Sequence, residues 1–386
     1  MTNFIHIADT HLGKVAFNKT TQDGSNLRET LIYENFLTAI EAIIDLEPEA
    51  VIHAGDLFDT VKPKTKALLV ALQALDMLKE ARIPFVAIAG NHSMQKNSYT
   101  TSAFEILQKA HPECTFAYSF KYENVKIGDT LFHLIPNMLC PEDYKKAAFD
   151  ASSYNRENPH CEKCNHVLVT HGLADTIPDK RLSSVAEFEL TPEVLLQSYD
   201  YIAGGHVHNQ MRVGTNMHYS GSLEYLTYGE MEDVKGGLLV NPEKHTVEHI
   251  ELPHCPMKDL GTIMCGGEPV EYFVDTLTDL IDPMSINANT MFQVTVDFEN
   301  DPIKSIPSDS LKDIRDSILD LKIKVRSNEL QRTEIKQQDL HAINYITEFE
   351  KFLQQRHLTE KQKISVLSHG TDTLKIVMAN HSEVLE

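Results

Sequence analysis

The sequence predicts an α/β fold for its first two thirds. Through residues 1–255, short apolar runs alternate with longer runs whose apolar residues recur at helical spacing. This alternation is typical of βαβ units, in which helices connect neighbouring strands. With 386 residues, 42% of them hydrophobic, the chain has an ordinary globular composition and the length of two or three domains.

Six short apolar runs are the expected strands of this core. They are Phe4–Ala8, Ala50–Ala54, Phe85–Ala89, Leu131–Ile135, Val167–Thr170 and Tyr201–Ala203. Two helices are expected between them. Thr30–Leu46 has an apolar stripe and is closed by Pro48, and Pro63–Arg82 has a leucine stripe that includes Leu68, Leu72 and Leu75.

Beyond about residue 210 the helical runs stop and short strands remain. Met217–Ser220, Gly237–Val240 and Val247–Leu252 fit a second sheet or a sheet edge. A composition shift at "ELPHCPMKDL" then marks a domain boundary near residue 255. The sequence therefore predicts one large domain over residues 1–255.

A smaller α+β module is expected over residues 256–330. Its predicted elements are a helix at Val270–Ile281, a strand at Phe292–Phe298, a helix at Ser308–Leu321 and a strand at Lys322–Arg326. Residues 331–386 are expected to form a polar helical segment with one apolar stripe. The stripe consists of Leu340, Ile343, Ile346, Phe349, Phe352 and Leu353. Such a stripe either packs on its own domain or docks onto a partner.

Composition and charge restrict the functional classes. The chain has 56 acidic and 35 basic residues, a net charge of −21, whereas a protein that grips nucleic acid through its own surface is usually basic. An acidic protein acting on DNA needs metal ions at its site or a partner that contacts phosphates. No run approaches the roughly 18–20 apolar residues of a membrane span, and the N-terminus resembles no signal peptide, so a cytoplasmic protein without membrane contact is expected.

Side chains that can bind metals follow five of the predicted strands. Open α/β sheets place their sites at these carboxyl ends, so five such occurrences predict one shared site. The sequences there are "IADTHLG", "IHAGDLFD", "IAGNHS", "VTHG" and "GGHVH". They contain Asp9 and His11, Asp56 and Asp59, Asn91 and His92, His171, and His206 with His208.

This donor set has a consistent chemistry. Aspartate, asparagine and histidine offer oxygen and nitrogen without any cysteine, which suits manganese, magnesium or iron better than structural zinc. Asp56 is the expected bridge, because each of its two oxygens could hold one of two divalent ions. Two such ions can clamp a phosphate and ionise a water for in-line attack, so a phosphodiester is the favoured substrate class.

The motifs Asp-x-His, Gly-Asp-x-x-Asp, Gly-Asn-His, His-Gly and Gly-His-x-His resemble those of the calcineurin-like metallophosphoesterases. Within that superfamily, "ADTHLGK", "AGDLFDT" and "AGNHS" are most similar to SbcD-type DNA repair nucleases. The resemblance implies a β-sandwich core flanked by helices, followed by a small α+β DNA-capping domain. It also implies a helical C-terminal segment that docks onto an SbcC-type ATPase.

The resemblance further implies roles for individual residues. One metal would be held by Asp9, His11, Asp56 and His208, and the other by Asp56, Asn91, His171 and His206. His92 would face the scissile phosphate as proton donor or transition-state stabiliser, and Asp59 would orient His92 or the water. One departure is Ser93, because the family usually has an acidic residue after Gly-Asn-His.

The implied function is a manganese-dependent DNA nuclease, an exonuclease and single-strand endonuclease, that processes DNA ends in double-strand-break repair. It would act as a homodimer together with the ATPase. An alternative is a phosphoesterase for a small phosphodiester or a phosphoprotein, and a third possibility is a non-catalytic scaffold that keeps the metals for structure. A module at residues 256–330 favours the nuclease, since a small-substrate hydrolase has less reason to carry one.

Other histidines and cysteines are expected to be structural. His6, His53 and His133 lie inside predicted strands and are expected to be hydrogen-bonded core residues or supports for the site. Cys161 and Cys164, flanked by His160 and His166, have the residue types of a zinc site. A reduced cysteine pair in a surface loop is the favoured interpretation, because a full zinc site usually needs two ligand pairs farther apart.

Overall fold

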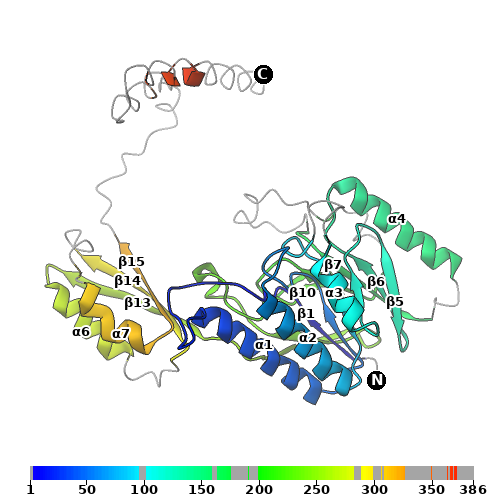
Figure 1. Cartoon of the computed structure of the whole chain (residues 1–386), viewed down its shortest axis with the longest axis horizontal. Helices are drawn as coiled ribbons and strands as arrows, with labels where there is room; N and C mark the ends of the chain where they lie inside the picture. Colours follow the sequence, from blue (N-terminus) through cyan, green and yellow to red (C-terminus); the bar gives the residue numbers. More distant parts are fainter. Residues whose placement is uncertain are drawn as a thin grey trace. The chain divides into compact units, whose positions relative to one another are not determined.

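A computed structural model describes most of the chain. The described residues are 3–94, 101–158, 163–174, 190, 199–281, 288–298, 306, 308–326, 349, 363, 366–367 and 369–371. Residues Met1–Arg326 form one compact unit and Ser327–Glu386 form a second (Figure 1).

The first unit contains two six-stranded sheets. The first sheet consists of β1 (Phe4–Ile7), β2 (Ala50–His53), β3 (Phe85–Ile88), β4 (Thr115–Ala117), β11 (Gly237–Asn241) and β12 (Thr246–Ile250). Its order is β12-β11-β1-β2-β3-β4, with β1 to β4 parallel and β11 antiparallel to both of its neighbours.

The second sheet is also parallel at its centre. It consists of β5 (Glu123–Ile127), β6 (Thr130–Ile135), β7 (Asn165–His171), β8 (Tyr201–Gly205), β9 (Met211–Val213) and β10 (Met217–Tyr219). Its order is β5-β6-β7-β8-β10-β9, and only β5 and β9 run antiparallel to their neighbours. The strands predicted beyond residue 210 are therefore divided between the two sheets.

Helices cover both outer faces of this sandwich. The helices are α1 (Leu27–Asp45), α2 (Thr65–Glu80), α3 (Ala103–Ala110) and α4 (Pro141–Glu157), with a 3-10 turn, η2, at Tyr228–Glu230. Side chains of α1, α2 and α3 pack on the first sheet, and those of α4 pack on the second. Figure 1 shows α1 and α2 side by side. The predicted β-sandwich flanked by helices is confirmed.

The strands at the centre are apolar at most positions because both of their faces are buried. In β1, Ile5 and Ile7 pack toward the helices, whereas Phe4 packs in the cluster between the two sheets. Successive side chains of a strand point to opposite faces, so a strand between two layers needs apolar residues at nearly every position. This explains why the sequence shows apolar runs here rather than an apolar–polar alternation.

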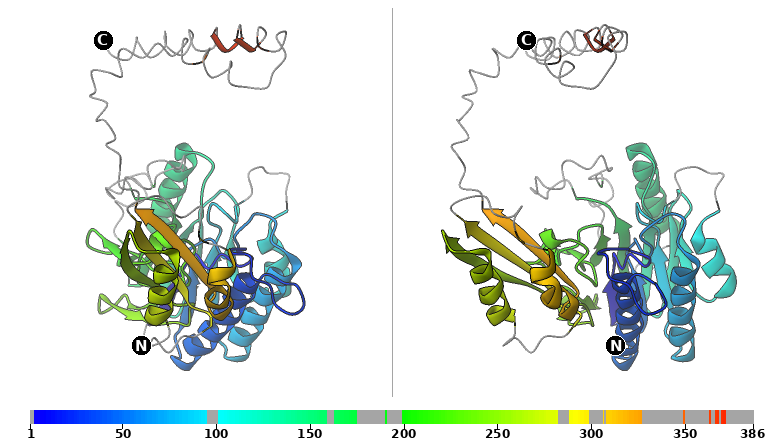
Figure 2. Two further views of the ribbon diagram at one scale, coloured as in Figure 1. Left: turned by 90° about the vertical axis from the view of Figure 1, so that its left-hand side faces the viewer. Right: turned by 60° about the vertical axis from the view of Figure 1, so that its left-hand side comes forward.

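A three-stranded parallel sheet with two helices follows the sandwich. It consists of β13 (Met257–Gly266), α6 (Val270–Ile281), β14 (Met291–Phe298), a 3-10 turn η5 (Ser308–Leu311), α7 (Lys312–Ser317) and β15 (Asp320–Arg326). Both helices lie on one face of the sheet (Figure 2) and share its apolar core. We call residues Met257–Arg326 the α+β module.

Two expectations for this module were wrong in detail. The strand β13 was absent from the sequence-based prediction, because its apolar residues are separated by exposed polar ones. The helix expected over Ser308–Leu321 is shorter, since Ser308–Leu311 form a 3-10 turn and α7 ends at Ser317. Ile318 and Leu319 are instead buried in the connection to β15, which begins at Asp320.

Only a few residues of the second unit are described, and they are helical. A Cβ atom at Gly370 would collide with the Phe349 ring, so this member of the predicted apolar stripe packs within its own unit. The other stripe residues lie outside the described part of the chain. Among the described residues, no helix combines the length and apolar character that crossing a membrane requires. The domain limits at residues 255 and 330 remain predictions.

Candidate metal centre

The carboxyl ends of five strands meet in one place. Three of these strands (β1, β2 and β3) are parallel neighbours in the first sheet, and two (β7 and β8) are parallel neighbours in the second. Every metal-ligand candidate from the sequence follows or ends one of them. They are Asp9, His11, Asp56, Asn91, His171, His206 and His208. Asp9, His11, Asp56, Asn91 and His171 are buried, and His206 and His208 are half-buried.

The backbone of this region adopts an uncommon conformation. Asp9, His11 and Asp56 have positive φ values of 52°, 45° and 54°, and His206 has a φ of 104°. Non-glycine residues rarely adopt such values, and they persist where surrounding contacts hold them. Here the loops after β1 and β2 bond each other, since Asp9 N–H donates to Gly55 O and His11 N–H to Asp56 O, both at 3.0 Å.

Glycines let the two sheets approach each other at the site. A Cβ at Gly205 would collide with the Ala54 carbonyl oxygen, and a Cβ at Gly55, where φ is +104°, would collide with His171. Two consecutive glycines after an apolar run, here Gly204 and Gly205, are typical of a turn that leaves the sheet. Both instead belong to β8, and Gly205 is required by close packing rather than by an unusual φ.

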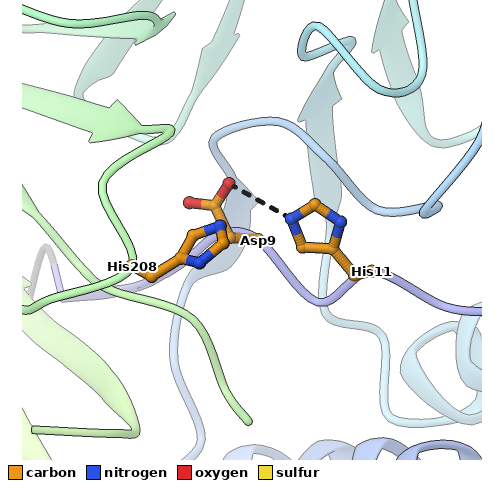
Figure 3. Close-up of side chains that lie close together, drawn as sticks. All are labelled: Asp9, His11 and His208. Atoms are coloured by element: carbon orange, nitrogen blue, oxygen red, sulfur yellow. Dashed lines mark ion pairs between the residues drawn. The ribbon is translucent and has the colours of Figure 1, made fainter. Parts of the chain in front are cut away.

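Asp9, His11 and His208 form the first ligand group (Figure 3). Their potential ligand atoms all lie within 4.8 Å of one another. His11 Nε2 is 3.9 Å from Asp9 Oδ1, and the His11 and His208 rings are 5.2 Å apart between centroids. Asp9 is fixed through its other oxygen, Oδ2, which accepts a 2.9 Å hydrogen bond from the His206 backbone N–H.

His171, Asn91 and Asp56 converge in a second group. His171 Nδ1 donates to the Ala54 carbonyl at 2.9 Å, which leaves Nε2 facing Asn91 Oδ1 at 2.8 Å and Asp56 Oδ2 at 3.4 Å. The His206 ring lies 5.5 Å from the His171 ring between centroids. Asp9, Asp56 and His171 also bring ligand atoms within 4.8 Å, so the two groups adjoin.

Asp56 connects the groups through a single oxygen. Its Oδ1 accepts hydrogen bonds from the His92 backbone N–H at 2.9 Å and from Ser93 Oγ at 3.3 Å. Its Oδ2 faces His11 Nε2 at 3.9 Å and His171 Nε2 at 3.4 Å. The sequence analysis expected one oxygen for each metal, whereas this geometry presents the same oxygen to both groups.

The residues present suit metal ions. Asp9 Oδ1 and His11 Nε2 are both buried and have no hydrogen-bond partner among the described residues. Burying polar atoms without partners is costly, so such atoms mark a place where a ligand is expected. Two atoms that each bind an ion at about 2.1 Å can lie up to about 4.2 Å apart, which accommodates their 3.9 Å separation.

The protonation states reflect this crowded environment. Burial would raise the pKa of Asp56, but His171 and His11 beside it hold that pKa well below its usual range. Burial likewise opposes a charge on His171, yet the Asp56 carboxylate outweighs it and raises the pKa of His171 to about 9. His171 therefore carries a proton at neutral pH in the metal-free protein, and a bound metal would displace that proton.

His92 and Asp59 lie at the open side of the site. The His92 side chain is exposed, and its Nδ1 is 2.9 Å from the backbone carbonyl oxygen of Asp59. The Asp59 carboxylate contacts His11 Nδ1 at 3.2 Å and Lys14 Nζ at 3.3 Å instead. Asp59 thus reaches His92 through its main chain and orients His11 with its side chain. His92, His11 and Asp56 also form a group within 4.8 Å, so proximity alone permits His92 to bind a metal.

Two charged residues at the site were missed by the sequence analysis. Glu230 Oε1 accepts a 3.1 Å hydrogen bond from His208 Nδ1, and Lys235 Nζ contacts both Glu230 Oε2 at 2.8 Å and the His208 carbonyl at 3.1 Å. Glu230 and Lys235 do not directly follow a predicted strand, and neither is part of a motif with a recognisable spacing. The only signal in the sequence is their position in the loop "GEMEDVKGG" before β11.

The three histidines expected inside strands, His6, His53 and His133, are buried and each has a side-chain partner. His6 Nδ1 is 2.9 Å from the Tyr201 hydroxyl, His53 Nε2 is 3.1 Å from Thr10 Oγ1, and His133 lies between Tyr122 and His166. His166 Nδ1 faces His133 Nε2 at 3.0 Å. Of the proposed zinc ligands, His160 and Cys161 lie outside the described residues.

Comparisons with known proteins agree with this geometry. The calcineurin-like phosphoesterase family matches residues 2–210. The DNA double-strand break repair protein Mre11 of Methanococcus maripaludis is 30% identical over 244 residues, which are 60% of this chain and 60% of that protein. A subunit of the SbcCD nuclease of Staphylococcus saprophyticus is 27% identical over 277 residues, which are 67% of this chain and 70% of that protein.

Among solved structures, a dimetal phosphatase from Danio rerio superposes with a TM-score of 0.35 and 13% identity, covering 58% of this chain and 87% of that one. The chain spans only about three fifths of the length of the Methanococcus relative. The family match covers more than half of the chain and includes every predicted site residue. This family implies a dinuclear metal centre, and the candidate ligand groups are consistent with one. The chain therefore belongs to the calcineurin-like phosphoesterase family.

Proposed function

We propose that this protein is a manganese-dependent DNA nuclease that hydrolyses phosphodiester bonds during the processing of DNA ends. The observation that carries the proposal is the convergence of Asp9, His11 and His208 with Asp56 and His171 at the strand ends of two sheets. The names of the relatives, a double-strand break repair protein and a nuclease subunit, support DNA as the substrate.

Seven residues would hold two divalent ions in this proposal. They are Asp9, His11, Asp56 and His208 for one ion, and Asp56, Asn91, His171 and His206 for the other. When bound, the ions would polarise a water and neutralise charge on the phosphate. Manganese is proposed because the donors are oxygen and imidazole nitrogen, without a thiolate; magnesium and iron are the other ions that this donor set suits.

The chain's own residues would supply orientation and a proton. The His92 Nδ1–H donates to the Asp59 carbonyl, so the ring holds a fixed orientation while its Nε2 remains available to a substrate. His92 would give a proton to the leaving oxygen, a role that typically contributes about 10²–10⁴-fold to the rate. The Asp59 carboxylate would hold His11 by accepting from its Nδ1, as supporting carboxylates commonly do for metal-bound histidines.

Partners are part of the same proposal. The net charge of −21 leaves few cations to displace the counterions of duplex DNA. We therefore propose that an SbcC-type ATPase binds residues 331–386 and supplies phosphate contacts, and that the protein acts as a homodimer. The relative named as part of a nuclease complex supports such an assembly.

The decisive experiment compares substrates. The full-length protein is incubated with Mn²⁺ and either single-stranded DNA, double-stranded DNA or bis(p-nitrophenyl) phosphate. Metal-dependent cleavage of DNA is expected, and the matched variant His92→Gln should lose it. Hydrolysis of the small ester without any DNA cleavage would contradict the proposal and favour a small-substrate phosphoesterase. Absence of hydrolysis of both, with metals bound, would favour a scaffold.

A further inference from the structure

One loop touches both the metal centre and the α+β module. This loop runs from the end of β10 to the start of β11, and it contains the 3-10 turn η2 at Tyr228–Glu230. Glu230 contacts His208 on one side, and Tyr228, two residues earlier in the same turn, contacts the module on the other. Neither contact could be recognised from the sequence.

Glu230 is held firmly against His208. Its Oε1 accepts from His208 Nδ1 at 3.1 Å and from Thr227 Oγ1 at 3.2 Å. Its Oε2 accepts from the Leu226 backbone N–H at 3.0 Å and from Lys235 Nζ at 2.8 Å. Because Nδ1 of His208 is engaged in this way, Nε2 is the ring nitrogen left to bind a metal.

Lys235 holds the Glu230 carboxylate through the oxygen that does not contact His208. The Lys235 side chain has no solvent exposure, and its ammonium contacts Glu230 Oε2, Ser222 Oγ at 2.8 Å and the His208 carbonyl at 3.1 Å. The Glu230 carboxylate therefore lies between the Lys235 ammonium, which contacts Oε2, and the His208 imidazole, which contacts Oε1.

Tyr228 connects this arrangement to the module. Its hydroxyl donates a 2.6 Å hydrogen bond to Asp320 Oδ2 at the start of β15, and Lys322 Nζ lies 4.9 Å from the centre of its ring. Tyr228 and Glu230 lie two residues apart in one 3-10 turn, which the Glu230 N–H closes by donating to the Thr227 carbonyl at 3.2 Å. The docking of β15 on Tyr228 thus restrains where Glu230 can lie.

We propose that Glu230 is a positioning residue for the metal centre, and that the Tyr228–Asp320 contact makes metal binding at His208 depend on the docking of the α+β module. Glu230 does not touch the metals or the substrate; it acts by holding the His208 ring. The inference rests on the metal centre but not on DNA as the substrate, so failure of the nuclease assay would leave it standing.

The test is a calorimetric titration of the full-length, metal-free protein with Mn²⁺. Glu230→Gln should weaken one of the two Mn²⁺ sites about 10–100-fold, the usual effect of losing a carboxylate that orients a ligand, and leave the other site unchanged. Tyr228→Phe and Asp320→Asn should each weaken the same site by a smaller factor, about fivefold, as the loss of one hydrogen bond predicts.

Lys19 offers a matched control at the same interface. Its Nζ donates to the carbonyl oxygens of Asp316 and Ile318 in the module, but it lies on a different loop from Glu230. Lys19→Met should therefore leave both Mn²⁺ affinities unchanged. Thermal unfolding of each variant separates a site-selective effect from a general loss of structure.

Three outcomes would overturn the proposal. Wild-type affinity at both sites in Glu230→Gln would remove Glu230 as a positioning residue. Equal weakening of both sites would indicate a general loosening rather than an action through His208. Equal effects of Lys19→Met and Tyr228→Phe would remove the specific connection through Tyr228. If Glu230→Gln does not fold, Tyr228→Phe and Asp320→Asn decide the matter, since both keep Glu230 in place.

Discussion

Asp56 Oδ2 lies 3.4 Å from His171 Nε2, although the two residues belong to different sheets. Asp56 follows β2 of the first sheet, whereas His171 ends β7 of the second. The candidate metal centre therefore forms only where the two sheets of the sandwich approach each other. Apolar packing between the sheets and the geometry of the site are consequently coupled.

Asp56 should be required for both metals. Asp56→Ala removes the oxygen that faces both ligand groups, so the variant should lose both ions, whereas His208→Ala should mainly weaken one. Elemental analysis of the purified proteins gives the stoichiometry directly. Equal retention of metal in the two variants would remove Asp56 as the bridge.

His92 should act on the substrate rather than on the metals. Because its side chain is exposed and its Nδ1 is bound to the Asp59 carbonyl, His92→Gln should keep a near wild-type metal content and lose about 10²–10⁴-fold in hydrolysis. Metal content and rate are measured on the same preparation. Loss of a metal would instead identify His92 as a ligand, which its proximity to His11 and Asp56 permits.

Acid should destabilise the sandwich through its buried histidines. Burial, together with the nearby His218, lowers the pKa of His6 to about 3, from 6.5 in the unfolded chain. Between these two pH values the unfolded state binds a proton at His6 that the folded state does not bind. The contribution of neutral His6 to the free energy of unfolding is therefore fully present above pH 6.5 and is lost as the pH decreases toward 3. One such histidine contributes a slope of about 1.4 kcal/mol per pH unit.

His6→Gln is the matching variant, because it removes the titrating group from the centre of the sandwich. The free energy of unfolding of the metal-free protein is measured by urea denaturation at several pH values between the two pKa values. In the variant it should change less steeply with pH, by the amount that corresponds to the uptake of one proton. Identical slopes for the variant and the wild type would show that His6 does not control this range.

The buried ion pair between Arg28 and Glu224 should be costly to break. The two groups are 2.9 Å apart, and both side chains are only 2% exposed. Glu224→Gln leaves the Arg28 charge buried without its counterion and should cost about 3–5 kcal/mol of unfolding free energy. The exposed pair Lys109–Glu105 is the control, since Glu105→Gln should cost under about 1 kcal/mol.

A double variant tests the reason for that cost. Arg28→Met combined with Glu224→Leu removes both charges, so it should be less destabilising than the sum of the two single changes. Additive losses in chemical denaturation would contradict the view that an uncompensated buried charge is the main penalty.

Residues 331–386 should be needed for the ATPase but not for the chemistry. Their deletion should leave metal binding and cleavage of short single strands intact and abolish ATP-dependent processing of duplex ends. Co-purification with an SbcC-type protein should also be lost. A truncated protein that binds the ATPase with unchanged affinity would contradict this. So would tight, steeply salt-dependent binding of duplex DNA by the full-length chain alone, because the charge of −21 predicts weak binding.

The sequence by itself determined the α/β class of the core and the identity of the candidate ligands. Both follow from local patterns, since an apolar run predicts a buried strand and the residues after a parallel strand lie at a shared edge. Asp9, His11, Asp56, Asn91, His171, His206 and His208 could all be named for this reason. The need for glycine at position 205 could not be predicted in this way, because it arises from Ala54 on the opposite sheet.

Only the tertiary structure decided how these residues are supported. Glu230 lies 22 residues after His208 in an irregular loop, and no periodicity connects the two. Likewise, nothing local indicates that the Asp59 carboxylate contacts His11 rather than His92, or that only Oδ2 of Asp56 faces both ligand groups. Such contacts depend on how two sheets close and where a loop crosses them, and these long-range arrangements leave no repeating signal in the order of the residues.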